Sequence, residues 1–127
     1  MELQVKQHQR ILVIEDEPVI SYVCHKILTK QGFAVDVVSD GKKAIASLNS
    51  QHYDLCILDP CMPVMDGIQL HDYLSNNVPK LYQGIIFTTD DINGNQLSGL
   101  LNLPDKVFLE KPFTSRELII AVEMALN

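Results

Sequence analysis

Three short polar segments carry residue types that could act together on a phosphoryl group. Glu15-Asp16 follows one apolar run, Asp59 ends a second, and Lys111-Pro112 comes just after a third. If these runs are parallel strands of one sheet, their carboxyl ends meet at one edge. Three acids and one base would then surround a cation and a phosphoryl group, so the spacing predicts phosphate chemistry.

The three carboxylates need a positive partner in order to lie close together. Grouped carboxylates repel one another and raise each other's pKa values unless a cation compensates. A ligand set made only of oxygen atoms, with room for water, suits Mg²⁺ or Mn²⁺. We therefore predict a divalent metal held by Glu15, Asp16 and Asp59, with Asp59 also placed as a nucleophile toward phosphorus.

The acidic cluster has a simpler alternative interpretation. Glu15, Asp16 and Glu17 could serve only to cap a helix that begins at Pro18, because acidic side chains favour the positive end of a helix dipole. Asp59 is harder to explain as solvated surface, since it directly follows the apolar run 55–58 and precedes a proline-rich loop.

Short apolar runs alternate with segments of helical periodicity along the chain. The continuous runs indicate strands buried on both faces, as in a parallel sheet with helices on either side. The segment 90–104 is expected to hold a short or mobile fourth helix, because its Asn and Gly residues oppose the helix that its Leu residues favour. The predicted strands are 11–14, 33–38, 55–58, 85–87 and 107–109. The helix start signals are Pro18, Asp40-Gly41, Asp66-Gly67 and the capping-box pair Thr114 and Glu117.

Length and composition fit one domain. The 127 residues are 46% hydrophobic and 20% charged, and they leave no room for a second core. A net charge of -6 with scattered basic residues argues against direct nucleic-acid contact. No apolar run is long enough for a membrane span or a signal peptide, so we expect a cytoplasmic protein without membrane contact. Residues 1–9 are expected to form a polar arm ahead of a domain over 10–127.

The motifs resemble the receiver domain of two-component response regulators. The supporting segments are ILVIEDEP at 11–18, LDPCMPVMDG at 58–67 and FLEKPF at 108–113. Their order is specific, with 43 residues from Asp16 to Asp59 and 52 from Asp59 to Lys111. The resemblance implies a flavodoxin-like, doubly wound (βα)5 fold of the α/β class, with parallel strands in the order 2-1-3-4-5 and helices on both faces.

The resemblance also implies a role for each site residue. Asp59 matches the phosphoacceptor, which takes its phosphoryl group from a phosphohistidine on a sensor histidine kinase or a histidine phosphotransfer protein. Glu15 and Asp16 match the acidic pair that holds Mg²⁺, and the backbone carbonyl of Cys61 matches a further ligand. Lys111 matches the lysine that pairs with the phosphoryl group or with Asp59.

Three further positions are expected to link the site to the surface. Thr89, which lies 22 residues before Lys111 and 30 after Asp59, is predicted to hydrogen-bond the phosphoryl oxygen. Thr88 is the alternative, since strand alternation lets only one of the two side chains point into the site. Phe108 matches the aromatic whose rotation couples phosphorylation to the face of the fourth helix, fifth strand and fifth helix. The alternative role for Phe108 is ordinary packing of a strand aromatic in the core.

Two positions depart from the family pattern, while a third follows it. Asp90 stands where a small residue is usual, and we hypothesise that its carboxylate slows attack by anionic phosphodonors or positions water for dephosphorylation. Unchanged rates in Asp90→Ala would exclude both effects. Pro60 removes a backbone N–H directly after the phosphoacceptor. Pro112 matches a proline usually preceded by a cis peptide.

The predicted function is therefore that of a signalling phosphoacceptor. We expect it to catalyse only its own phosphotransfer and dephosphorylation, and otherwise not to be an enzyme. A pseudo-receiver that binds partners without phosphorylation is the alternative. A phosphatase of the haloacid dehalogenase type would need a second Asp where Cys61 stands, and a dinucleotide module would need a Gly-rich turn after the first strand. Three cysteines without metal-ligand spacing favour neither a disulfide framework nor a zinc site.

The sequence leaves the wider setting open. The segment 108–113 looks like that of many receivers attached to hybrid histidine kinases. With no output domain after Asn127, we expect a stand-alone regulator, a relay intermediate or a receiver cut from a larger protein. The output partner is therefore fused or separate, and the oligomeric state is open, with a dimer among the options.

Overall fold

A five-stranded parallel sheet forms the centre of the protein, with the strand order β2-β1-β3-β4-β5. The computed structural model describes residues 9–60, 67–78, 81, 84–90 and 106–126. The strands are β1 (Arg10–Ile14), β2 (Ala34–Val38), β3 (Leu55–Leu58), β4 (Ile85–Thr89) and β5 (Val107–Glu110). The predicted α/β class, strand order and parallel pairing are confirmed. The order reverses between β1 and β3, and a doubly wound sheet binds ligands at the carboxyl ends of the strands beside such a reversal.

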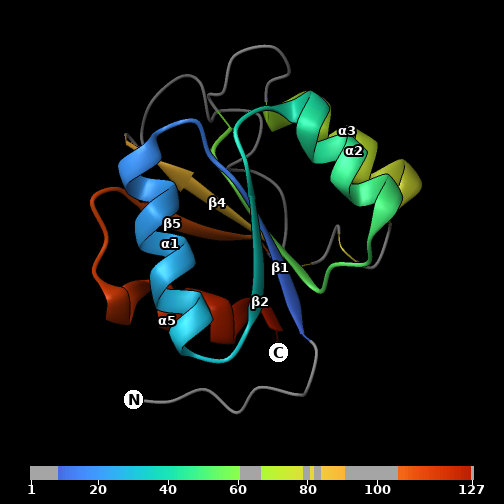
Figure 1. Cartoon of the computed structure of the whole chain (residues 1–127). Coiled ribbons are helices and arrows are strands. Elements are labelled where there is room, and N and C mark those ends of the chain that lie inside the picture. The colour runs from blue at the N-terminus through green and yellow to red at the C-terminus, as the bar shows by residue number, and fades with distance from the viewer. Residues whose placement is uncertain (1–8, 61–66, 79–80, 82–83, 91–105, 127) are drawn as a thin grey trace.

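Helices cover both faces of the sheet (Figure 1). The helix pair α1 (Pro18–Lys30) and α5 (Ser115–Leu126) covers one face, while α2 (Gly41–Ser50) and α3 (Gly67–Asn77) cover the other. The predicted fourth helix lies outside the described residues, apart from Asp90 at its start, and so do residues 1–8 of the expected arm. Within the described part of the chain, no helix has the length and apolar character needed to cross a membrane.

Strand alternation explains why the apolar runs are continuous. In β1, Ile11 and Val13 pack into the cluster under α1 and α5, whereas Leu12 and Ile14 pack into the cluster under α2 and α3. All four side chains have no exposed surface. A central strand such as β1 therefore needs apolar residues at successive positions, because it contributes to two cores at once.

Helix starts follow the capping signals of the sequence. The Glu117 N–H donates to Thr114 Oγ1 at 3.1 Å, and the Thr114 N–H donates to Glu117 Oε1 at 3.0 Å, which confirms the capping box before α5. Asp40 caps α2 by accepting a 2.8 Å hydrogen bond from the Lys43 N–H. These caps fix where α2 and α5 begin.

Backbone hydrogen bonds extend the sheet beyond three of its strands. The Glu15 N–H donates to the Val38 carbonyl at 3.0 Å, and the Asp59 N–H donates to the Ile14 carbonyl at 3.0 Å. The Lys111 N–H donates to the Thr89 carbonyl at 2.7 Å. Residues from the three motifs therefore start from fixed backbone positions at one edge, as their place after the apolar runs predicts.

Candidate functional site

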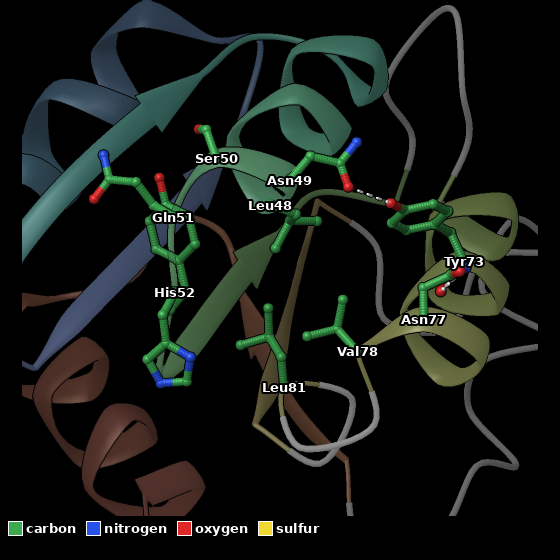
Figure 2. Close-up of a pocket in the computed structure, with 10 residues that line it drawn as sticks. Leu48, Asn49, Ser50, Gln51, His52, Tyr73, Asn77, Val78 and Leu81 are labelled. Atoms are coloured by element: carbon green, nitrogen blue, oxygen red, sulfur yellow. Dashed lines mark hydrogen bonds between the residues drawn. The ribbon is translucent and has the colours of Figure 1, made fainter.

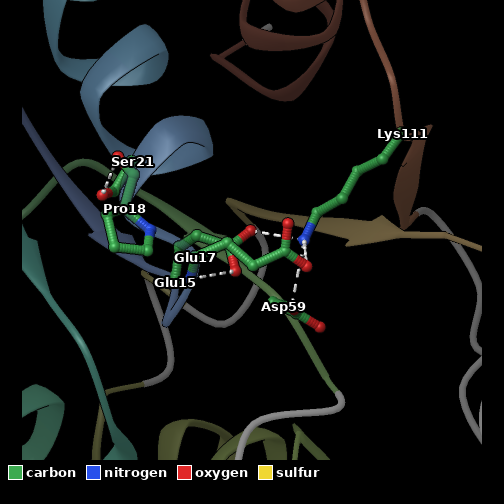
Figure 3. A network of polar contacts seen from close by, with 6 residues as sticks. All are labelled: Glu15, Glu17, Pro18, Ser21, Asp59 and Lys111. Atoms are coloured by element: carbon green, nitrogen blue, oxygen red, sulfur yellow. Dashed lines mark hydrogen bonds and ion pairs between the residues drawn. The ribbon is translucent and has the colours of Figure 1, made fainter.

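The Lys111 ammonium lies at the centre of a group of carboxylates (Figure 3). The distances from Lys111 Nζ are 2.5 Å to Glu15 Oε1, 3.0 Å to Asp59 Oδ2 and 3.6 Å to Glu17 Oε1. The side chains of Lys111, Glu15 and Asp59 are nearly buried, at 3%, 3% and 8% exposure. The predicted convergence of Glu15, Asp59 and Lys111 on one sheet edge is thus present in the structure.

Glu15 is electrostatically the most perturbed carboxyl group of the site. Burial raises the pKa of Glu15 from 4.5 to about 7, although the Lys111 ammonium lowers it and the neighbouring Asp59 charge raises it further. Burial alone would lower the pKa of Lys111, but its contacts with Glu15 and Asp59 outweigh burial and raise that pKa. The ammonium therefore stays charged, but its single positive charge does not balance the negative charges of the three carboxylates around it.

Glu17, rather than Asp16, joins Glu15 and Asp59. One carboxylate oxygen from each of Glu15, Glu17 and Asp59 lies within 4.8 Å of the others, while the Asp16 side chain is exposed and lies outside that cluster. Asp16 lies at a bend after β1, and the Glu17 N–H donates to Glu15 Oε2 at 3.2 Å, so the chain turns here and Glu17 Oε1 lies 3.6 Å from Lys111 Nζ. Sequence reasoning missed Glu17 as a site residue, and its place in the acidic run 15–17 was the available signal.

The capping interpretation of the acidic segment has no support at α1. Glu17 occupies the N-cap position, yet its side chain accepts no hydrogen bond from the helix. Its own N–H instead donates to Glu15 Oε2 at 3.2 Å. The Glu15 and Glu17 carboxylates are directed toward Lys111, so they serve the site rather than the helix end.

The residues present fit a hard divalent cation. Their donor atoms are all oxygens, and three carboxylates face one ammonium. Glu15 Oε1 is buried and pairs with the Lys111 ammonium, which is also the ion-pair partner of Asp59 and Glu17. A buried carboxylate oxygen that shares a single ammonium with two other carboxylates is a suitable ligand for a cation. The predicted ligand Cys61 lies outside the described residues.

Thr88 and Thr89 are both buried at the end of β4, at 2% and 4% exposure. Alternation places Thr88 on the face of Ile86, under α1 and α5, and Thr89 on the face of Phe87. The Thr89 carbonyl also accepts the hydrogen bond that fixes the Lys111 backbone. The assignment of Thr89 as the hydroxyl that contacts a phosphoryl group stays a prediction, with Thr88 as the alternative.

Phe108 packs against Phe87 across β4 and β5, with ring centroids 5.4 Å apart. It is half-buried and belongs to the cluster under α2 and α3, as ordinary core packing predicts. Its predicted coupling to a switch surface involves the fourth helix, outside the described residues. The peptide bond between Lys111 and Pro112 is cis, as the resemblance implies.

The cysteines in the described part of the chain are buried thiols. Burial raises the pKa of Cys24 and Cys56 to about 12, so both remain protonated at neutral pH. They add no nucleophile to the site.

A hollow of about 550 Å³ lies away from this site, between the ends of α2 and α3 and the start of β3 (Figure 2). Tyr73 Oη donates to Asn49 Oδ1 at 3.0 Å at its rim, and Tyr53 and Leu81 are buried beneath it. None of the site residues lines it. The chemistry of the three motifs therefore has no connection to this hollow.

The Glu15 environment predicts a pH-dependent stability in metal-free buffer. A carboxyl group whose pKa is raised in the folded state favours folding below its unfolded pKa, and that stability is lost as pH rises through about 7. Relative to Glu15→Gln, the free energy of unfolding of the unchanged protein should fall by about 1–3 kcal/mol between about pH 4.5 and pH 8. Urea denaturation at both pH values measures this difference. Parallel curves for the two proteins would contradict it.

Comparison with known proteins identifies a family to which this site is related. The family model described as the response regulator receiver domain matches residues 11–123. The transcriptional regulatory protein QseB of Haemophilus influenzae is 40% identical over 121 residues, which are 93% of this chain and 52% of QseB. The chain thus spans about half the length of this relative.

Solved structures share the fold closely. The signal receiver domain of an HD domain-containing protein from Pseudomonas fluorescens Pf-5 has a TM-score of 0.85 and 25% identity, covering 98% of this chain and 90% of that one. The receiver domain of sensor histidine kinase PA1611 from Pseudomonas aeruginosa has a TM-score of 0.81 and 29% identity, covering 94% of this chain and 98% of that one. That structure has a magnesium ion coordinated in its active-site cleft.

Proposed function

The chain belongs to the response regulator receiver domain family, and from that premise we propose that Asp59 accepts a phosphoryl group in a Mg²⁺-dependent reaction. One observation carries the proposal. The Asp59 carboxylate is nearly buried, yet it lies in direct contact with the Lys111 ammonium and close to two further carboxylates. This arrangement supplies a nucleophile, a fixed cation and a set of oxygen ligands at one sheet edge.

In the proposed reaction, one Asp59 carboxylate oxygen attacks the phosphorus atom of the donor. The new bond joins this oxygen to phosphorus, while the bond from phosphorus to the leaving atom breaks and its electron pair departs with the leaving group. The leaving group is an imidazole nitrogen of a phosphohistidine, or acetate from acetyl phosphate. Lys111 Nζ, 3.0 Å from Asp59 Oδ2, is placed to hold the carboxylate and then an oxygen of the transferred group.

Glu15 and Asp59, which the structure brings together, would hold Mg²⁺. Asp16, which is exposed and lies outside that cluster, and the backbone carbonyl of Cys61 are the further ligands that the sequence predicts. The bound ion would supply positive charge beside the transferring oxygens. The excess of carboxylates over ammonium groups supports this part of the proposal. The magnesium ion reported in the PA1611 receiver domain supports it as well.

Intact mass spectrometry after incubation with acetyl phosphate tests the proposed function. With Mg²⁺ we expect one phosphoryl group per chain, and with a chelator none. Hydroxylamine should remove the group, because it cleaves acyl phosphates. Under the same conditions, absence of any adduct with prolonged incubation and a phosphohistidine donor would favour the pseudo-receiver.

Paired substitutions decide between the two threonines. Replacing Thr89 by Val, which keeps the shape and removes the hydroxyl, should slow adduct formation by about tenfold, since a hydrogen bond to a charged group is lost. Thr88→Val should change the rate by less than about twofold, because its hydroxyl is not expected to reach the phosphoryl group. Rates of adduct formation at fixed acetyl phosphate measure both. The opposite ranking would assign the role to Thr88.

The partner in this proposal is a sensor histidine kinase or a histidine phosphotransfer protein. Phosphorylation of Asp59 would act by shifting the populations of a protein-interaction surface, and the output would come from a fused or separate partner. Any nucleic-acid contact would belong to that partner, as the names of relatives such as QseB suggest for those longer proteins. Apart from its own phosphotransfer and dephosphorylation, the domain is proposed to catalyse nothing. We also propose a cytoplasmic location for the domain.

A further inference from the structure

Glu17 is the solvent-facing member of the group around Lys111. The Glu15 and Asp59 side chains are 3% and 8% exposed, whereas Glu17 is 50% exposed. Glu17 Oε1 nevertheless lies 3.6 Å from Lys111 Nζ, within ion-pair distance. Figure 3 shows the Glu17 carboxylate beside the Lys111 ammonium, and of the three carboxylates it is the one most exposed to water.

The start of α1 leaves the Glu17 side chain free for this contact. Glu17 is the N-cap residue, but its carboxylate accepts no hydrogen bond from the first turn of α1. The Glu17 N–H is fixed by its hydrogen bond to Glu15 Oε2 at 3.2 Å. The same segment therefore holds the Glu17 backbone and turns its side chain toward Lys111.

The Lys111 ammonium has a limited number of hydrogen-bond donors for its partners. An ammonium group has three N–H donors. The three carboxylates of Glu15, Asp59 and Glu17 lie 2.5, 3.0 and 3.6 Å from Lys111 Nζ, so each donor already has a negative partner nearby. A phosphoryl oxygen that binds Lys111, as the proposed function requires, would have to displace the most distant of these partners, which is Glu17. The Glu17 charge would also repel an anionic donor.

We propose that Glu17 is a positioning residue that holds Lys111 in the unphosphorylated site and selects against highly charged phosphodonors. This inference rests on the proposed function. It gives Glu17 a role similar to the one hypothesised for Asp90, and the Asp90 hypothesis stays a prediction. Asp90 is exposed, and the described ion-pair partners of Lys111 are Glu15, Glu17 and Asp59. We attribute the proposed selection against charged phosphodonors to the contact between Glu17 and Lys111, and not only to an exposed position near the site.

Phosphodonors of different charge distinguish a role of Glu17 in donor selection from a purely structural role. We expect Glu17→Gln to raise the second-order rate constant for acetyl phosphate, a dianion at neutral pH, by about fivefold. For phosphoramidate, which carries less negative charge, the increase should be at most about twofold. Added salt should speed the reaction of the unchanged protein with acetyl phosphate relative to Glu17→Gln, because screening weakens the repulsion. A structural defect would lower both rates together.

The matched control is Glu110→Gln, the same exchange at an exposed residue next to Lys111. It should leave the ratio of the two donor rates unchanged. Mg²⁺ affinity is measured for each variant and the rates are taken at saturating Mg²⁺, so that altered metal binding is separated from donor selection. Equal rate ratios in Glu17→Gln and the unchanged protein would overturn this inference alone. No adduct in the unchanged protein would overturn the proposed function and this inference together.

Discussion

Replacing Asp59 by Asn should abolish the phosphate adduct, with a fall in rate of about 10³-fold or more. The amide is uncharged and is a poor nucleophile toward phosphorus. Asn retains an oxygen that can accept a hydrogen bond from Lys111, and the backbone bond from residue 59 to Ile14 does not depend on the side chain. The fold should therefore survive the change. Intact mass after incubation with acetyl phosphate and Mg²⁺ measures the loss.

Asp72→Asn is the matched control, because it makes the same exchange at an exposed position on α3. It should accept phosphate at the rate of the unchanged protein. Asp59→Asn should also lower the pKa of Glu15, since the Asp59 charge is one of the causes that raise it. If Asp59→Asn carried as much adduct as the unchanged protein, the phosphoacceptor would be another residue.

Replacing Lys111 by Met should lower the free energy of unfolding by about 3 kcal/mol at about pH 8 without metal. Met keeps an unbranched apolar stem, but the nearly buried carboxylates of Glu15 and Asp59 lose their ammonium partner. Without that charge, the pKa of Glu15 rises further. Its raised folded pKa means that stability present at low pH is lost as pH increases. The defect should therefore shrink at about pH 5.5, and urea denaturation at both pH values measures it.

Lys26→Met, at an exposed position on α1, is the control for the loss of a positive charge. It should change the free energy of unfolding by less than about 0.5 kcal/mol. Adding Glu15→Gln to Lys111→Met should recover part of the lost stability, because it removes one of the two stranded charges. If Lys111→Met were as stable as the unchanged protein at about pH 8, the ammonium would not be what balances the buried carboxylates.

The fold follows from patterns that act over a few residues. Continuous apolar runs require burial on two faces, and the structure places Ile11 and Leu12 in opposite cores. Helix caps such as Thr114 with Glu117 are also local, so they appear where the sequence predicts them. The segment in which the sequence predicts a fourth helix carries conflicting signals, and it falls outside the described residues apart from Asp90.

By itself, the sequence determined which chemical groups reach the sheet edge, because each motif directly follows a strand and parallel strands end together. Asp59, Glu15 and Lys111 were therefore predictable as neighbours. Only the tertiary structure decided which acidic residue of the first segment faces them. That choice depends on the bend at Asp16 between β1 and α1, after which Glu17 lies within ion-pair distance of Lys111 while Asp16 is exposed. Burial decided the rest, since the raised pKa of Glu15 arises from chain segments packed around it and from no residue type alone.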